Sequence, residues 1–288
     1  MVLKNSDIEL KELLAVPNML LRSKLILSGY YRGIHSVPFK GLSSEFSQYR
    51  QYLPGDDFSR IDWKVFLRSG KAYIKESDDE SNTSLFIIVD SSKSMIFGNK
   101  SDYAASLAAV LGFVSINQND SLGYTILSGG NGEVKPPSSK KSRLFEFFAD
   151  LGSLKPSGAI NMDTLYGKIV NSIKKRSFFV LISDGFLEEE RLFKLFDNVR
   201  AKKTDAIFFH LHSQSDTDED ILSSVSLKDI ESGETIQGGS FESRKRTLIQ
   251  RNRRIYAQCA LSGIEHIDVY VEEGFSKPLS YFFEKRRK

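Results

Sequence analysis

Residues 85–95 read LFIIVDSSKSM, an apolar run that ends in Asp90 and is followed by three serines and a lysine. A continuous apolar run of this length predicts a β-strand that is buried on both faces. Ser92 and Ser94 follow the carboxylate at alternate positions, in what we expect to be a tight turn that enters a helix. The stretch therefore predicts a parallel sheet with polar side chains at the carboxyl end of one strand.

Strand and helix patterns alternate through the rest of the chain. Helices between buried strands supply the crossover connections of a parallel sheet. The expected fold class is α/β, a doubly wound, mostly parallel sheet with helices on both faces, plus an N-terminal helical and short-strand extension. Further strands are predicted at 121–127, 177–184, 205–212 and 266–271, and helices at 102–117, 142–154, 162–174, 188–201 and 241–263.

The chain before the first buried strand has few strongly periodic apolar elements. Leucines near helical spacing in residues 7–28 predict one or two packing helices, with Pro17 as a break. We therefore divide the chain into an N-terminal extension, residues 1–83, and an α/β domain, residues 84–288. The Gly, Pro and Ser stretch at 128–142 predicts a surface loop.

Composition narrows the class of protein. The 288 residues are 40% hydrophobic, and 40 Lys and Arg against 37 Asp and Glu give a net charge of only +3. This excess is too small to imply nucleic acid or an anionic membrane as a partner. The single cysteine, Cys259, is expected to be a packed thiol. Neither a signal peptide nor a membrane-spanning run is apparent, so the expected location is the cytoplasm.

Two aspartates end predicted strands in the same way. Asp90 ends the first buried strand, and Asp184 ends another in the sequence FFVLISDG. Strands of a doubly wound sheet bind ligands at their carboxyl edge, and two carboxylates brought close there need a cation between them. Hydroxyls from Ser92 and Ser94, without His or Cys, favour Mg²⁺ or Mn²⁺ over zinc. The simpler alternative is a turn in which Asp and Ser only cap a helix.

Three motifs carry a resemblance to known families. DSSKS, residues 90–94, resembles the Asp-x-Ser-x-Ser motif of the metal-ion-dependent adhesion site in von Willebrand factor A-like domains, and ISDG resembles its later aspartate element. Upstream, residues 41–76 resemble the signature of the bacterial domain-of-unknown-function 58 family, which precedes an A-like domain. The resemblance implies that residues 84–288 form such a domain and that Asp90, Ser92, Ser94 and Asp184 bind the metal.

The chain departs from the family pattern at one loop. Members carry a Pro-x-Gly-Gly-Thr loop, whereas residues 155–163 read KPSGAINMD with Ile160 at the threonine position. An isoleucine cannot bind a cation. Asn161, Asp163 and Thr164 begin the following helix and are the substitute ligands, so the resemblance implies a weak or degenerate site.

Other charged and titratable residues are expected to be structural. DTDED, residues 216–220, fails as a calcium-binding EF-hand because Ile221 replaces the glycine at its sixth position. The basic residues of 241–263 are expected to form a solvated helix face. The four histidines show neither ligand nor general-base spacing: His35, His210, His212 and His266.

Two functions from different classes follow from these residues. The first is a non-enzymatic, metal-dependent protein-interaction module, and the resemblance adds a MoxR-type AAA+ ATPase as the partner of such an adaptor or assembly factor. The second is a Mg²⁺-dependent phosphoryl-transfer or hydrolase enzyme that uses Asp90 as nucleophile. The chain lacks a GxxxxGK[ST] phosphate loop and has Ser92 where this chemistry places a second acid, so we prefer the module. Neither nucleic acid nor membrane insertion is expected.

Overall fold

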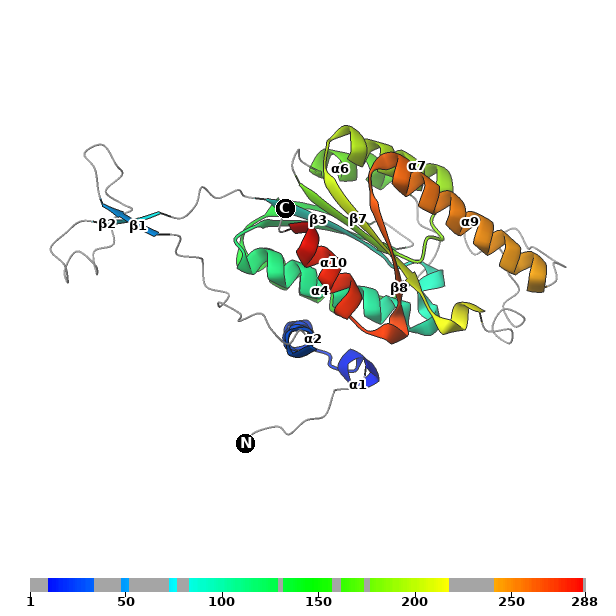
Figure 1. Ribbon diagram of the computed structural model, residues 1–288, viewed down its shortest axis with the longest axis horizontal. Coiled ribbons are helices and arrows are strands. Elements are labelled where there is room, and N and C mark those ends of the chain that lie inside the picture. Colours follow the sequence, from blue (N-terminus) through cyan, green and yellow to red (C-terminus); the bar gives the residue numbers. More distant parts are fainter. Residues whose placement is uncertain are drawn as a thin grey trace.

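A computed structural model describes residues 10–33, 48–51, 73–76, 83–128, 132–156, 162–173, 177–217 and 241–286. Its main feature is a six-stranded sheet in the order β5-β4-β3-β6-β7-β8, parallel except for β5 (Figure 1). The strands are β3 (Ser84–Asp90), β4 (Ser121–Leu127), β5 (Val134–Ser138), β6 (Phe178–Ser183), β7 (Asp205–His212) and β8 (Glu265–Tyr270). The strand order reverses between β3 and β6, so the predicted doubly wound α/β fold is confirmed.

Helices cover both faces of the sheet (Figure 1). One face carries α1 (Leu10–Leu14), α2 (Met19–Gly33), α4 (Lys100–Asn117), α5 (Lys141–Gly152) and α10 (Ser276–Arg286). The other face carries α6 (Met162–Ser172), α7 (Glu189–Ala201) and α9 (Phe241–Ser262). Short 3₁₀ helices are η2 (Lys93–Asn99), η3 (Gln214–Thr217) and η4 (Val271–Glu273), and a separate antiparallel pair is formed by β1 (Gln48–Gln51) and β2 (Tyr73–Glu76). Among the described helices, none is both long and apolar enough to cross a bilayer.

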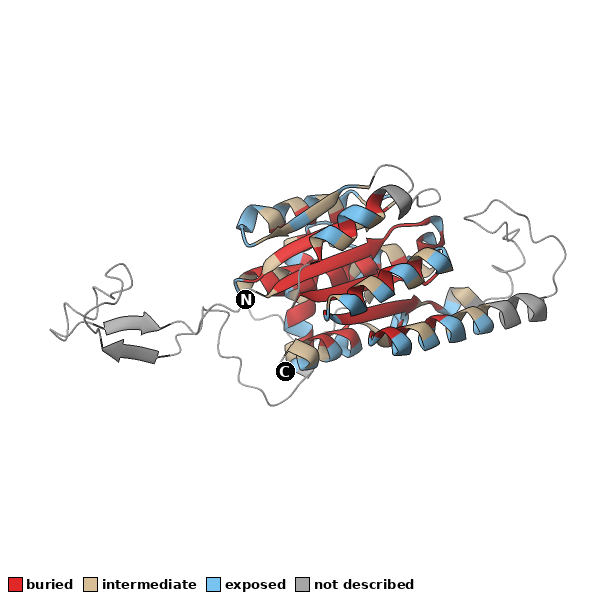
Figure 2. Cartoon of the chain, turned by 90° about the horizontal axis from the view of Figure 1, so that it is seen from above, coloured by how far each residue is buried: buried red, intermediate tan, exposed pale blue. Residues whose placement is uncertain are grey.

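The central strand explains the layered core. Every residue of β3 is buried, as the apolar run predicts, and Figure 2 shows the inner strands as the most buried part of the sheet. Alternate side chains point to opposite faces, so Ile87 packs toward α4 while Phe86 and Ile88 pack toward α6 and α7. The strand thus divides the apolar side chains into two cores.

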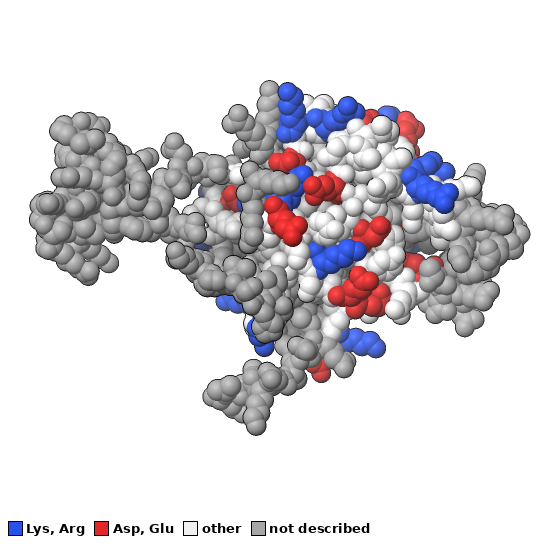
Figure 3. All heavy atoms as spheres, viewed as in Figure 1, with Lys and Arg blue, Asp and Glu red and all other residues white. Residues whose placement is uncertain are grey.

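Helix α2 of the N-terminal region packs onto the sheet domain. Ile26 and Leu27 are buried in the same core as α4, and the guanidinium of Arg22 donates to Ser106 Oγ at 3.0 Å. Helix α4 is apolar on most of its surface because it lies between the sheet and α2. Figure 3 shows the molecule from the same side as Figure 1, and acidic and basic side chains are intermixed on that face.

One element was predicted wrongly. Residues 128–142 were expected to form a surface loop, but Val134–Ser138 form β5, antiparallel to β4. Pro136 and Pro137 lack an N–H and read as loop residues, yet an edge strand tolerates them because one side of its backbone needs no partner. Most of the signature at 41–76 lies outside the described residues.

Candidate metal and partner site at the carboxyl edge of the sheet

Asp90 is held at the point where the winding of the sheet reverses. It ends β3 beside the neighbouring end of β6 and has no exposed surface. Its Oδ1 accepts the backbone N–H of Ser92 at 2.8 Å, and its Oδ2 accepts the hydroxyl of Ser183 at 2.5 Å. Both carboxylate oxygens are therefore fixed by the two loops that meet at this edge.

A run of oxygens links the loop after β3 to the loop after β6. Ser92 Oγ lies 2.9 Å from Ser94 Oγ, and Ser94 Oγ donates to Asp184 Oδ1 at 3.0 Å. All three side chains are buried. The structure thus brings together the four residues that the sequence singles out as metal ligands: Asp90, Ser92, Ser94 and Asp184.

The second oxygen of Asp184 is engaged by a lysine that the sequence did not single out. Lys100, the first residue of α4, lies with its Nζ 2.9 Å from Asp184 Oδ2 and 2.8 Å from Asp216 Oδ1. Its side chain is only 1% exposed. Burial alone would lower the pKa of Lys100, but the charges of the two carboxylates outweigh it and raise the pKa above its ordinary value. The site therefore contains its own cation.

Burial and the charge of Asp184 disfavour the charged form of Asp90, whereas the carboxylates around Lys100 favour the charged form of the lysine. Burial and the charge of Asp184 raise the pKa of the Asp90 carboxyl to about 6, although the hydrogen bonds from Ser183 and Ser92 favour the ionised form. At pH 7 the buried carboxyl of Asp90 is therefore ionised, although its surroundings favour the protonated form.

We expect Asp90→Asn to stabilise the protein above pH 6. Because the folded-state pKa of Asp90 is raised from 3.8 to about 6, its protonation stabilises the fold below about pH 4, and this contribution is lost as the pH rises through 6. A neutral amide avoids that loss, so the variant should gain about 1–3 kcal/mol at pH 7.5 and nothing near pH 4. Urea unfolding in a chelator across this range measures the difference.

The control is Asp205→Asn, which removes an exposed carboxylate at the other end of the sheet. Its unfolding free energy should follow that of the wild type. Equal pH profiles for Asp90→Asn and the wild type would contradict a raised pKa at Asp90.

The donor atoms fit a small divalent cation. In an octahedral Mg²⁺ site with bonds of 2.0–2.1 Å, neighbouring ligand oxygens lie about 3 Å apart. The separations along Ser92, Ser94 and Asp184, 2.9 and 3.0 Å, match this value, and all three donors are hard oxygens. The positive charge of Lys100 next to Asp184 opposes a second cation, which agrees with a weak site.

The third loop of the expected site lies largely outside the described residues. Ile160 and Asn161 lie outside the described residues, and Asp163 and Thr164 are described only as backbone in the first turn of α6. Their roles as substitute ligands stay a prediction.

The loop that carries Asp184 is fixed from two sides. His210 Nε2 lies 3.0 Å from the backbone carbonyl of Asp184. From α9, Arg251 donates to the carbonyl of Gly185 at 2.7 and 3.0 Å and also to that of Leu187. The expectation of a purely solvated basic helix face is therefore wrong for Arg251, because the backbone carbonyls of this loop turn toward α9.

The family of the chain follows from a direct match. A family model described as "Protein of unknown function DUF58" matches residues 48–257. The chain belongs to the DUF58 family. The match spans β1 to α9, so the family unit of this DUF58 protein includes both loops of the candidate site and part of the segment predicted as an N-terminal extension.

Curated relatives of this DUF58 protein are described as uncharacterized proteins. Proteins of Mycobacterium bovis (strain ATCC BAA-935 / AF2122/97) and Mycobacterium tuberculosis (strain ATCC 25618 / H37Rv) are each 31% identical over 119 residues. The match covers 40% of this chain and 38% of the length of each relative.

Solved structures similar to the chain share little sequence with it. A conserved hypothetical protein, BatB from Bacteroides thetaiotaomicron, is 12% identical with a TM-score of 0.47, covering 71% of this chain and 97% of that one. The SpRpn10 VWA domain is 12% identical with a TM-score of 0.40, covering 66% and 92%. The fold assignment rests on the strand order described above.

Proposed function

We propose that this DUF58 protein is a non-enzymatic, metal-dependent protein-interaction module that contacts its partner at the carboxyl edge of the sheet. The observation that carries the proposal is the run of oxygens from Ser92 through Ser94 to Asp184, with spacings that suit Mg²⁺ or Mn²⁺. A bound divalent cation would supply an open coordination position for an acidic side chain of the partner. Ser92, Ser94 and Asp184 would hold the ion, while Asp90 orients the turn that carries the serines.

The environment of Asp90 favours binding over catalysis. A nucleophilic carboxylate needs an oxygen that can reach the substrate. Both oxygens of Asp90 accept hydrogen bonds, and the residue has no exposed surface. The Mg²⁺-dependent phosphoryl-transfer or hydrolase enzyme is therefore the weaker alternative.

We further propose an adaptor or assembly role with a MoxR-type AAA+ ATPase, a partner implied by the family resemblance. The test is binding of the full chain to the purified MoxR-type ATPase of the same organism, with Mg²⁺ or with a chelator. We expect Ser92→Ala and chelation each to weaken binding at least about tenfold, because each removes a metal contact. Ser139→Ala, an exposed serine after β5, is the matched control and should bind as the wild type does.

Two results would count against this proposal. Equal binding in all of these conditions would mean that the sheet edge does not contact the partner through a metal. Turnover of a phosphatase substrate or a nucleoside triphosphate in Mg²⁺, lost in Asp90→Asn, would replace the module with the enzyme.

A further inference from the structure

Three histidines and one aspartate lie close together on β7 and β8, the last two strands in the order of the sheet. His210 and His212 lie on β7, and His266 and Asp268 lie on β8. In this parallel pair His210 is in register with Asp268, and Phe208 with His266. Because side chains alternate along a strand, all four point to the face that α9 covers.

Ligand atoms of His210, His212 and Asp268 all lie within 4.8 Å of one another, and His266 adjoins this group. His212 Nε2 lies 2.7 Å from Asp268 Oδ1, and His210 Nδ1 lies 3.0 Å from His266 Nε2. Asp268 Oδ1 is also 3.8 Å from His210 Nδ1 and 4.0 Å from His266 Nε2. In a tetrahedral zinc site with bonds of 2.0–2.1 Å, ligand atoms are about 3.3 Å apart. The observed separations lie on either side of that value, so small side-chain shifts would complete the site.

A backbone contact fixes the tautomer that a metal requires of His210. Its Nε2 faces the carbonyl of Asp184 at 3.0 Å, and a carbonyl can only accept, so Nε2 carries the proton. Its Nδ1 therefore directs a lone pair into the cluster. Histidine ligands of metals commonly donate their second N–H to a backbone carbonyl in this way. The ring is also stacked on Phe208, with centroids 5.1 Å apart, which holds its orientation.

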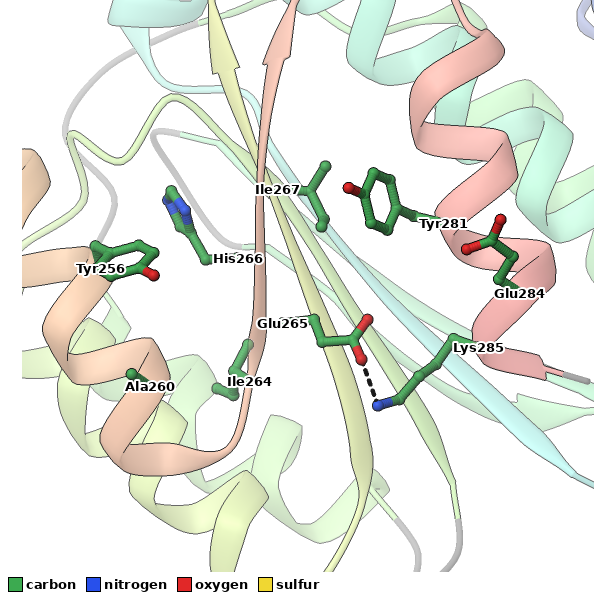
Figure 4. A pocket seen from close by; sticks show the side chains of 9 residues that line it. All are labelled: Tyr256, Ala260, Ile264, Glu265, His266, Ile267, Tyr281, Glu284 and Lys285. Atoms are coloured by element: carbon green, nitrogen blue, oxygen red, sulfur yellow. Dashed lines mark hydrogen bonds and ion pairs between the residues drawn. The ribbon is translucent and has the colours of Figure 1, made fainter. Parts of the chain in front are cut away.

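The charge state and exposure of the cluster also suit a metal. Burial lowers the pKa of His210 well below its ordinary value and lowers that of His266, so both imidazoles are neutral at pH 7. The hydrogen bond from His212 lowers the pKa of Asp268 to about 2. Asp268 is 51% exposed. His266 and Tyr256 also line a cavity of about 470 Å³ beside β8 (Figure 4).

We propose that His210, His212, His266 and Asp268 form a transition-metal site of the Zn²⁺ class, separate from the oxygen site at Asp90. Three imidazoles and one carboxylate suit Zn²⁺, whereas Mg²⁺ takes oxygen ligands. The ion displaces the proton that His266 Nε2 shares with His210 Nδ1, so His266 binds as its other tautomer. Since His210 also contacts the carbonyl of Asp184, the metal braces the loop that carries Asp184.

The test is calorimetric titration of the chelator-treated full chain with Zn²⁺ alone. We expect one equivalent to bind, and His212→Gln and Asp268→Asn each to weaken binding about 100-fold. Co²⁺ is the spectroscopic probe: the wild type should show intense visible absorption typical of tetrahedral cobalt, and both variants should lose it. Asp205→Asn, a 70% exposed carboxylate at the other end of β7, is the control and should bind as the wild type does.

Both variants change partly exposed side chains, and circular dichroism in chelator checks that their fold is kept. Ser92→Ala should bind Zn²⁺ normally if the two sites are separate. The proposal is overturned if the wild type shows no saturable binding, or if His212→Gln and Asp268→Asn bind as tightly as the wild type. Loss of binding in Ser92→Ala alone would also overturn it, because the ion would then lie at the oxygen site.

Discussion

Lys100→Met should lower the free energy of unfolding by about 3 kcal/mol, because it leaves Asp184 buried without a counter-charge. Methionine keeps the length and most of the apolar stem of lysine, so packing around α4 changes little. Breaking a buried ion pair by removing one partner costs about 3–5 kcal/mol, and partial exposure of Asp216 favours the lower end. Urea unfolding at pH 7 in a chelator measures the loss.

Lys93→Met is the matched control for Lys100→Met. Lys93 is exposed in the same turn, so its replacement should change stability by less than about 0.5 kcal/mol. Addition of Mg²⁺ should stabilise Lys100→Met more than the wild type, because the ion then meets two carboxylates whose charge no lysine neutralises. Equal losses for the two lysine variants would contradict the role of Lys100 as the internal cation of the site.

Gly185→Ala should cost about 3 kcal/mol, the second large effect. Gly185 has a φ of +76°, a conformation that costs a residue with a Cβ about 1–2 kcal/mol. The added Cβ would also lie 2.7 Å from His210 Nε2 and would push the imidazole off the carbonyl of Asp184, a hydrogen bond whose loss costs about 1–3 kcal/mol. Thermal and urea unfolding measure the change.

Gly263→Ala separates the strain from the steric clash. Gly263 has a φ of +69°, and no described heavy atom lies within 4 Å of the Cβ position. Its replacement should therefore cost only about 1–2 kcal/mol. If both alanine variants lose the same stability, the contact between Gly185 and His210 does not constrain the loop.

Asp184 connects the two candidate metal sites. Its carboxylate accepts from Ser94 and Lys100 in the oxygen site, while its carbonyl faces His210 of the histidine cluster. One residue therefore contacts both sites, through its carboxylate on one side and its backbone carbonyl on the other. The order of the sheet produces this link, since β6, which ends just before Asp184, lies next to β7, which carries His210.

Local patterns in the sequence determined the fold class and pointed to four residues of the site at the carboxyl edge. The apolar run of β3 and the alternation of strands with helices require a parallel sheet, because such strands bury both faces and need crossover helices. Asp90 and Asp184 meet because the carboxyl ends of parallel strands share one edge of the sheet. Ser92 and Ser94 follow from their position in the turn after Asp90.

The rest was decided by tertiary structure. Lys100 is 84 residues from Asp184 and 116 from Asp216, and no spacing in the sequence pairs them. The histidines carry no motif, because their ligand geometry arises only when β8 pairs with β7 and aligns His210 with Asp268. Alternation within a strand is a local property that the sequence records. Which strand lies beside which depends on the free energy of packing the whole sheet, and only the folded chain reveals it.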